Sequence, residues 1–189
     1  MVVSDERKGT ASPWVGGTPP PRLAGTNTAV FADHLDYVHH SLMRLGVPSC
    51  EVEDLTHEVF LVFHRRSDTI DRGLPLRPWL FGVAYRISLA AARRRRRELP
   101  TSEGEIEALA NVPSTVSDAS DSRALVQRAL ERLPLPARAV LVMHEIDGVP
   151  MREVARAMSI PLFTAYSRMR VAKRGFEAAV RELLDGGAP

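Results

Sequence analysis

The chain has 189 residues, of which 44% are hydrophobic, enough for one ordinary domain or two small ones. The net charge is only +2, so overall charge does not by itself indicate a polyanionic partner. The single cysteine, Cys50, excludes a disulfide framework and fits a reducing setting. No apolar stretch approaches the roughly 18 residues that span a bilayer, and the N-terminus lacks the apolar core of a signal peptide. We therefore expect a cytoplasmic protein without membrane insertion.

The first part of the chain changes from an irregular to a helical pattern. Residues 1–27 are rich in proline, glycine and threonine and are predicted to be a disordered extension. The apolar residues that follow recur at spacings of three and four until Gly46, which ends a first predicted helix. A second helix begins near Ser49, and a third begins near Pro78 and ends in five consecutive arginines. These three helices make a first helical unit at 28–98.

Residues 99–121 carry prolines, serines and acids but no lysine or arginine, and are predicted to be a flexible acidic linker. A second helical unit follows at 122–185. Its predicted helices lie at about 122–133, 136–146, 151–158 and 162–184. No segment shows the alternating pattern of a strand. The sequence therefore predicts an all-α protein of two small helical domains joined by the linker.

Acidic and basic residues are segregated along the first unit. Residues 33–71 hold eight acids and three arginines, whereas residues 72–97 hold eight arginines and no acid. The run Arg93–Arg97 has a simple interpretation as a solvated helix end, which also suits the helix dipole. Five consecutive arginines surround the helix and repel one another, however, so we favour contact with the phosphates of a polyanion.

The short helix, the turn at Ser159 and the long last helix of the second unit have the order of a helix-turn-helix. On the last helix a core stripe is predicted at Ala165, Met169, Ala172, Phe176, Val180 and Leu183. Another face, polar and cationic near the helix start, carries Tyr166, Ser167, Arg170 and Arg174, with Lys173 beside it. Arginines there can pair with guanine or grip phosphate. Similar three-helix units also bind proteins, so this motif alone leaves DNA and protein partners open.

Neither a metal site nor an enzyme active site is indicated. The six histidines fit no zinc spacing, and there is no second cysteine to help them. There is no glycine-rich phosphate loop, nucleophile elbow or paired acid constellation. Trp79 could stack on a base of single-stranded DNA, but its place on an apolar stripe favours a role in the core. We expect no cofactor and no catalysis.

Several segments resemble, in the right order, motifs of the bacterial extracytoplasmic-function (ECF) sigma factors. Residues 53–63, EDLTHEVFLVF, are similar to the family's EDLTQEVFLxxW segment, and residues 78–84, PWLFGVA, are similar to its xWLYxIA segment. Residues 133–138, LPLPAR, resemble LPxxxR, and residues 148–155 resemble GxxxxEIA. Thr164, Ser167 and Arg168 fall on the TxxSR of the family's recognition helix. The resemblance covers about residues 29–184.

The resemblance implies an RNA polymerase sigma factor with sigma domain 2 at 28–98 and sigma domain 4 at 122–185. The first domain would bind the β′ clamp helices of core RNA polymerase and the −10 element of promoter DNA. The second would read the −35 element and touch the β flap, while the acidic linker would thread toward the active-site cleft. An anti-sigma factor would hold the protein inactive by masking both domains.

The contacts that the resemblance implies fall on three sets of residues. Core-polymerase binding is expected at Asp54, His57 and Glu58. Contact with the −10 element is expected at Arg72, Arg77, Arg86, Arg93, Arg94, Arg95, Arg96 and Arg97. Contact with the −35 element is expected at Thr164, Tyr166, Ser167, Arg168, Arg170, Lys173 and Arg174.

The chain also departs from the family's motifs. His57 stands in place of a glutamine and Arg86 where an asparagine is common, while Ser159 and Phe163 stand in place of glycines and Tyr166 in place of a cation. Two alternatives therefore stay open. One is a sigma-like module that binds an anti-sigma factor and never engages promoters. The other is a stand-alone helix-turn-helix regulator, which leaves the first unit unexplained.

Overall fold

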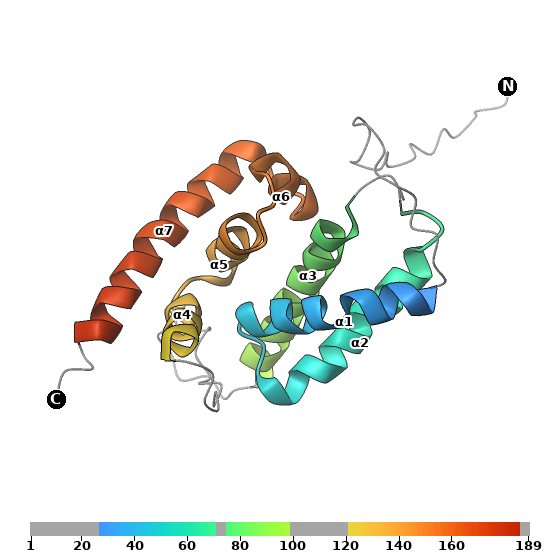
Figure 1. Ribbon diagram of the computed structural model, residues 1–189, viewed down its shortest axis with the longest axis horizontal. Helices are drawn as coiled ribbons and strands as arrows, with labels where there is room; N and C mark the ends of the chain where they lie inside the picture. The colour runs from blue at the N-terminus through green and yellow to red at the C-terminus, as the bar shows by residue number, and fades with distance from the viewer. Residues whose placement is uncertain (1–26, 71–74, 99–120, 186–189) are drawn as a thin grey trace, which may run out of the picture.

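The computed structural model describes residues 27–70, 75–98 and 121–185, and within these ranges every regular element is helical (Figure 1). The elements are α1 (Asn27–Arg44), α2 (Ser49–Arg66), α3 (Leu76–Glu98), α4 (Asp121–Glu131), α5 (Leu135–Leu141), the π-helical turn η1 (Val142–Ile146), α6 (Met151–Ala157) and α7 (Leu162–Asp185). The predicted all-α class of two helical domains is confirmed. Nearly all of the predicted disordered extension and of the predicted linker lies outside the described residues; Asn27 begins α1 and Asp121 begins α4.

Helices α1, α2 and α3 pack against one another and form the N-terminal unit. Each contributes fully buried side chains to one core, among them Val38, Leu42, Val52, Val59, Leu80 and Phe81. Gly46 ends α1 with φ +82, the left-handed conformation that glycine adopts without a steric penalty. The N–H of Val47 then bonds the carbonyl of Leu42 at 3.1 Å, so the chain reverses into α2 with its helix-end groups satisfied.

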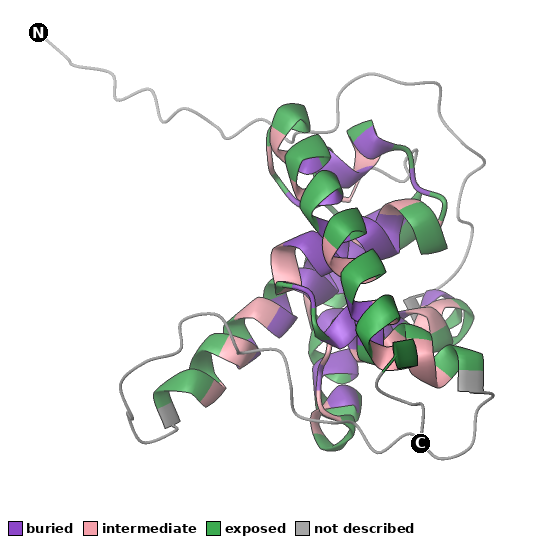
Figure 2. Cartoon of the chain, turned by 90° about the vertical axis from the view of Figure 1, so that its left-hand side faces the viewer, coloured by how far each residue is buried: buried purple, intermediate pink, exposed green. Residues whose placement is uncertain are grey.

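The C-terminal unit is built on α7, which α4, α5 and α6 contact. Ala165, Met169 and Ala172 are buried on the inner side of α7, as the predicted stripe requires, while Phe176 is partly buried. The outer side of α7, which faces the viewer in Figure 2, is exposed along the helix. The short α6, the turn and α7 therefore have the arrangement of a helix-turn-helix whose second helix presents a free face.

One helix differs from the sequence expectation. The stretch predicted as a single helix over 136–146 is α-helical only to Leu141 and continues as the π-helical turn η1. In that turn the N–H of Asp147 bonds the carbonyl of Val142, five residues back, at 3.0 Å. The stretch holds no glycine or proline inside the turn, so its pattern gave no sign of the wider winding.

The two units lie side by side rather than apart (Figure 1). Helix α3 packs against α6, and α1 contacts α4. Buried residues continue from one unit into the other as a single hydrophobic cluster. The sequence predicted two units but not this contact between them.

Candidate functional site

The outward face of α2 is acidic. Asp54, His57 and Glu58 are all exposed, and their spacing of three and four residues places them on one side of the helix. None of the three makes a hydrogen bond or ion pair with another described residue. Leu61, one turn further along the same side, is 54% exposed. The face is therefore charged, with an exposed apolar side chain at one end, and is free to meet another macromolecule.

Some arginines of helix α3 contact other parts of the chain, and others are exposed at its end. Arg95 bonds Glu51 of α2 at 2.6 Å, and Arg86 donates to the carbonyl of Ala157 in α6 at 3.2 Å. The guanidinium of Arg77 lies 5.3 Å from the centre of the Tyr37 ring, within cation–π range. The other members of the tract are exposed at the end of α3: Arg93, Arg94, Arg96 and Arg97. Arg72 lies outside the described residues.

Trp79 contributes to the core as the apolar pattern predicted. It is partly buried and packs on the hydrophobic cluster, with its ring centroid 6.2 Å from that of Phe63 in an edge-to-face arrangement. This contact joins α2 to the start of α3. The side chain is thus held between the two helices rather than projecting freely.

The turn between α6 and α7 sets the direction of the candidate recognition helix. Ser159 in that turn has φ +55, a left-handed conformation in which most residues are strained and glycine is not. Its N–H bonds the carbonyl of Arg156 at 3.0 Å, and the N–H of Ile160 bonds that of Ala155 at 2.9 Å. A serine can therefore occupy the position at which the family's motif has glycine, and the turn geometry is kept.

The exposed face of α7 carries most of the residues predicted to meet DNA. Tyr166, Ser167, Arg170, Lys173 and Arg174 are exposed, and Thr164 and Arg168 are half-buried. Lys173 bonds Glu145 at 2.8 Å, and this hydrogen bond lowers the pKa of Glu145. Arg170 and Arg174 make no ion pair with any described residue. The structure thus places two arginines without ion pairs one turn apart on α7, the first of them one turn beyond the exposed Tyr166.

The most exposed apolar residues of α2 and of α7 were absent from the predicted contact sets. Phe163, in the first turn of α7, is 83% exposed, and Leu61 lies within the acidic face of α2. Both could have been found from the sequence, because each falls outside the apolar stripe of its own helix. Each adds exposed apolar area to its helix.

A buried arginine joins the two units. Arg138 of α5 is 1% exposed, and its guanidinium bonds the carbonyls of Glu131 at 2.6 Å and Leu133 at 3.0 Å within its own unit. It also bonds the carbonyl of Leu45 at the end of α1, 2.9 Å away. Burial lowers the pKa of Arg138 to about 10, so the guanidinium stays charged at neutral pH. A β-carbon at Gly46 would lie 2.0 Å from this guanidinium, so only glycine leaves room for it.

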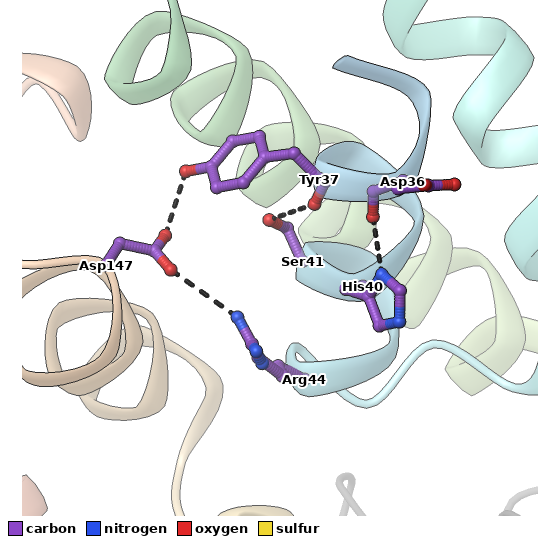
Figure 3. A network of polar contacts seen from close by, with 6 residues as sticks. All are labelled: Asp36, Tyr37, His40, Ser41, Arg44 and Asp147. Carbon is purple, nitrogen blue, oxygen red and sulfur yellow. Dashed lines mark hydrogen bonds and ion pairs between the residues drawn. The ribbon is translucent and has the colours of Figure 1, made fainter. Parts of the chain in front are cut away.

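A second polar contact between the units centres on Asp147, just after η1 (Figure 3). Tyr37 of α1 donates its hydroxyl to one carboxylate oxygen at 2.8 Å, and Arg44 approaches the other at 3.4 Å. Burial raises the pKa of Asp147, while Tyr37 and Arg44 oppose that shift. Burial and the nearby Asp147 carboxylate both raise the pKa of Tyr37, so its hydroxyl remains a donor.

The described part of the chain contains neither a cluster of metal-binding side chains nor a helix that could span a membrane. No group of three or more histidine, cysteine, aspartate or glutamate side chains in it is placed to hold a metal ion. None of its helices combines the length and apolar character needed to cross a bilayer.

Comparisons with known families place both units. Residues 30–98 match the family described as Sigma-70 region 2, and residues 123–174 match the one described as Sigma-70, region 4. The chain is 26% identical over 156 residues to the ECF RNA polymerase sigma-E factor of Escherichia coli K12, covering 76% of this chain and 81% of that protein. This chain belongs to the ECF RNA polymerase sigma factors. The ECF sigma factor SigE of Mycolicibacterium smegmatis is 29% identical over 140 residues, covering 72% of this chain and 54% of that one.

Two solved structures share the fold of this ECF sigma factor. One is the sigma factor RpoE of Bartonella quintana in complex with the anti-sigma factor NepR, with a TM-score of 0.64 and 17% identity over 82% of this chain and 96% of that one. The other is CnrH in complex with the cytosolic domain of CnrY, with a TM-score of 0.57 and 20% identity over 86% and 89% of the two chains. Each likeness covers helices from both units.

Proposed function

We propose that this ECF sigma factor directs core RNA polymerase to promoters and so starts transcription. The observation that carries the proposal is that one chain matches both region 2 and region 4. Each of these regions also has an exposed charged face. We assign 28–98 to sigma domain 2, 99–121 to the linker and 122–185 to sigma domain 4. We propose no function for residues 1–27.

The core-polymerase contact is proposed for the acidic face of α2. Asp54, His57 and Glu58 would meet basic groups of the β′ clamp helices, because exposed carboxylates without internal partners attract complementary charge. Leu61 adds an apolar contact at the end of the same face. Domain 4 would in turn contact the β flap.

Promoter contact is proposed for two faces. The exposed arginines at the end of α3, with Arg77, Arg86 and Arg72, would hold the −10 element mainly through phosphates. The first half of α7 would read the −35 element from the major groove. There Arg170 would pair with a guanine or a phosphate, and Tyr166 with the methyl group of a thymine or a neighbouring sugar. Thr164, Ser167, Arg168, Lys173 and Arg174 would complete this contact.

Regulation by an anti-sigma factor is also proposed. Two solved proteins with this fold were captured as sigma factor with anti-sigma factor and as CnrH with CnrY, which supports a partner of the same kind here. We further propose that the protein acts in the cytoplasm, needs no cofactor and catalyses no reaction of its own, because its task is to bind polymerase and DNA.

One observation favours a second function, that of a sigma-like module that binds an anti-sigma factor without reading promoters. Phe163 is 83% exposed at the start of α7, where the family's motif has glycine, and it lies beside the exposed Tyr166. Such a pair suits an apolar protein partner as well as it suits DNA. Promoter selectivity separates the two functions.

The test is in vitro transcription with core polymerase and a promoter library randomised at the −35 element. The wild type should select a sequence, and Arg170→Ala should relax that preference at one base pair by about 1–3 kcal/mol if Arg170 pairs with guanine. A uniform loss across all sequences would instead assign Arg170 to a phosphate. Tyr166→Phe separates ring contact from hydroxyl contact, and Arg181→Ala, on the exposed C-terminal half of α7, is the matched control. The same flat preference for every protein would favour the anti-sigma-binding module.

A further inference from the structure

The first turn of α7 carries a large aromatic side chain that is not part of the core. Phe163 is 83% exposed, more than any other large apolar side chain in the described part of the chain. It makes no ring contact with another described residue. Its neighbours Leu162 and Tyr166 are 38% and 53% exposed. Moving this ring from water onto a partner surface would favour binding, because apolar area would leave water.

Phe163 shares one side of α7 with residues proposed to meet DNA. An α-helix turns by about 100° per residue, so Ser167, Arg170 and Arg174 lie within about 40° of Phe163 around the helix axis. All of them are exposed, on the outer side of α7 that faces the viewer in Figure 2. Phe163 is therefore the first residue of an exposed stripe. It stands at the end of the helix from which a helix-turn-helix contacts base edges.

The charge around Phe163 favours DNA over an apolar protein partner. Residues 151–176, which cover α6, the turn and the first part of α7, hold six cations and one acid. The cations are Arg152, Arg156, Arg168, Arg170, Lys173 and Arg174, and all but Arg168 are exposed. Lys173 bonds Glu145, and the other five make no ion pair with a described residue. Such a surface is complementary to the phosphates on either side of a DNA groove.

A phenyl ring can recognise only one feature of the major groove. The base edges there present hydrogen-bond donors and acceptors, together with the C5-methyl group of thymine. A ring without donors or acceptors would leave the polar edges unsatisfied if it covered them. Against the methyl group it removes apolar area from water on both sides of the contact. The family's motif has glycine at this position, which offers no side chain for such a contact.

We propose that Phe163 is a specificity-determining residue whose ring packs on the C5-methyl group of a thymine in the −35 element. The proposal rests on the proposed function, since it names the base that one residue of the −35 reader selects. Phe163 and Arg170 are seven residues apart, or about 10 Å along α7. Base pairs stack about 3.4 Å apart, so the two side chains meet different base pairs. Loss of either should change the sequence preference at its own position.

The decisive substrate replaces thymine by deoxyuridine, which pairs with adenine in the same way but lacks the C5-methyl group. The starting promoter carries the −35 sequence that the wild type selects from the randomised library. Each of its thymines, on either strand, is replaced in turn, and binding of the holoenzyme is measured by titration. For the wild type, replacement at one position should weaken binding about fourfold, the factor expected when one methyl group loses its apolar contact.

The variants assign that loss to one side chain. Phe163→Ala removes the ring, and it should bind the thymine promoter about fourfold or more weakly and show no further loss with deoxyuridine. Phe163→Leu keeps an apolar side chain and should retain the sensitivity. Leu184→Ala is the matched control, because it removes a 60% exposed apolar side chain from the other end of α7, and it should behave as the wild type. Since Phe163 and Leu184 are both exposed, none of these changes removes core packing.

The outcomes separate this proposal from the proposed function. An equal deoxyuridine effect in the wild type and in Phe163→Ala would assign the methyl contact to another residue, such as Tyr166, and overturn the proposal. A wild type that selects no thymine, or that does not distinguish thymine from deoxyuridine, would also overturn it. In each of these cases the wild type still selects a −35 sequence, so the proposed function would stand. A wild type without any −35 preference would contradict both.

Discussion

The acidic face of α2 and the basic helix α3 belong to the same unit, but they differ in how much of their charge is free. Asp54, His57 and Glu58 make no hydrogen bond or ion pair with the rest of the described chain. On α3, by contrast, Arg95 bonds Glu51 and Arg86 bonds Ala157. Clusters of like charge in a sequence thus serve contacts within the molecule as well as contacts with partners. The folded structure is needed to tell the two kinds of contact apart.

The largest effect is expected on the acidic face. Replacing both Asp54 and Glu58 by arginine should weaken binding to core polymerase by about 1–3 kcal/mol, or roughly 5- to 150-fold, because attraction becomes repulsion. A titration of labelled protein with core enzyme measures the affinity. The control replaces the exposed Asp33 and Asp36 of α1 in the same way, with an equal change in charge. Equal affinities for both double variants would remove α2 from the polymerase interface.

A smaller effect is expected when only the free arginines of α3 are removed. Replacing Arg93, Arg94, Arg96 and Arg97 by alanine should weaken promoter binding for all sequences alike. The slope of log affinity against log salt should fall by about 0.9 for each phosphate that the protein no longer neutralises. The measurement is holoenzyme binding to promoter DNA at several salt concentrations. Four exposed arginines elsewhere, Arg65, Arg123, Arg128 and Arg181, form a control of equal charge, and an unchanged slope in the first variant would make the tract a solvated helix end.

The smallest effect is expected for Arg95, which already forms an ion pair within the protein. Arg95→Ala removes the partly exposed ion pair with Glu51 and should lower the free energy of unfolding by about 0.2–1 kcal/mol. It should leave the salt dependence of promoter binding unchanged. Chemical denaturation and the same salt titration measure the two quantities. A fall in the salt slope with no loss of stability would reverse the division of roles within the tract.

The helices were predictable because their apolar spacing is regular and their ends carry clear signals. Gly46 and Gly148 both adopt left-handed conformations at turns, and α7 follows its predicted stripe over Ala165 and Met169. Such signals lie within a few residues of one another. The helix-turn-helix and the charged faces could therefore be predicted from the sequence alone.

The contacts between the units could not be predicted in this way. Tyr37 and Asp147 are 110 residues apart in sequence, and neither stands out from its neighbours in the pattern. Arg138 would be expected at the surface, yet it is buried because three backbone carbonyls from both units surround it. Pairings of this kind depend on how helices pack, and helical periodicity carries no information about them.

The π-helical turn η1 has a consequence for how this chain tolerates insertions and deletions. A π turn holds one residue more than an α-helical turn, so loss of one residue from Val142–Ile146 would restore regular winding. Because the π turn absorbs the extra residue, Asp147 would keep about the same direction from the helix axis and stay within reach of Tyr37. The helix-turn-helix beyond it would keep its own packing. Relatives of this sigma factor that lack one residue here should therefore keep the contact between Tyr37 and Asp147.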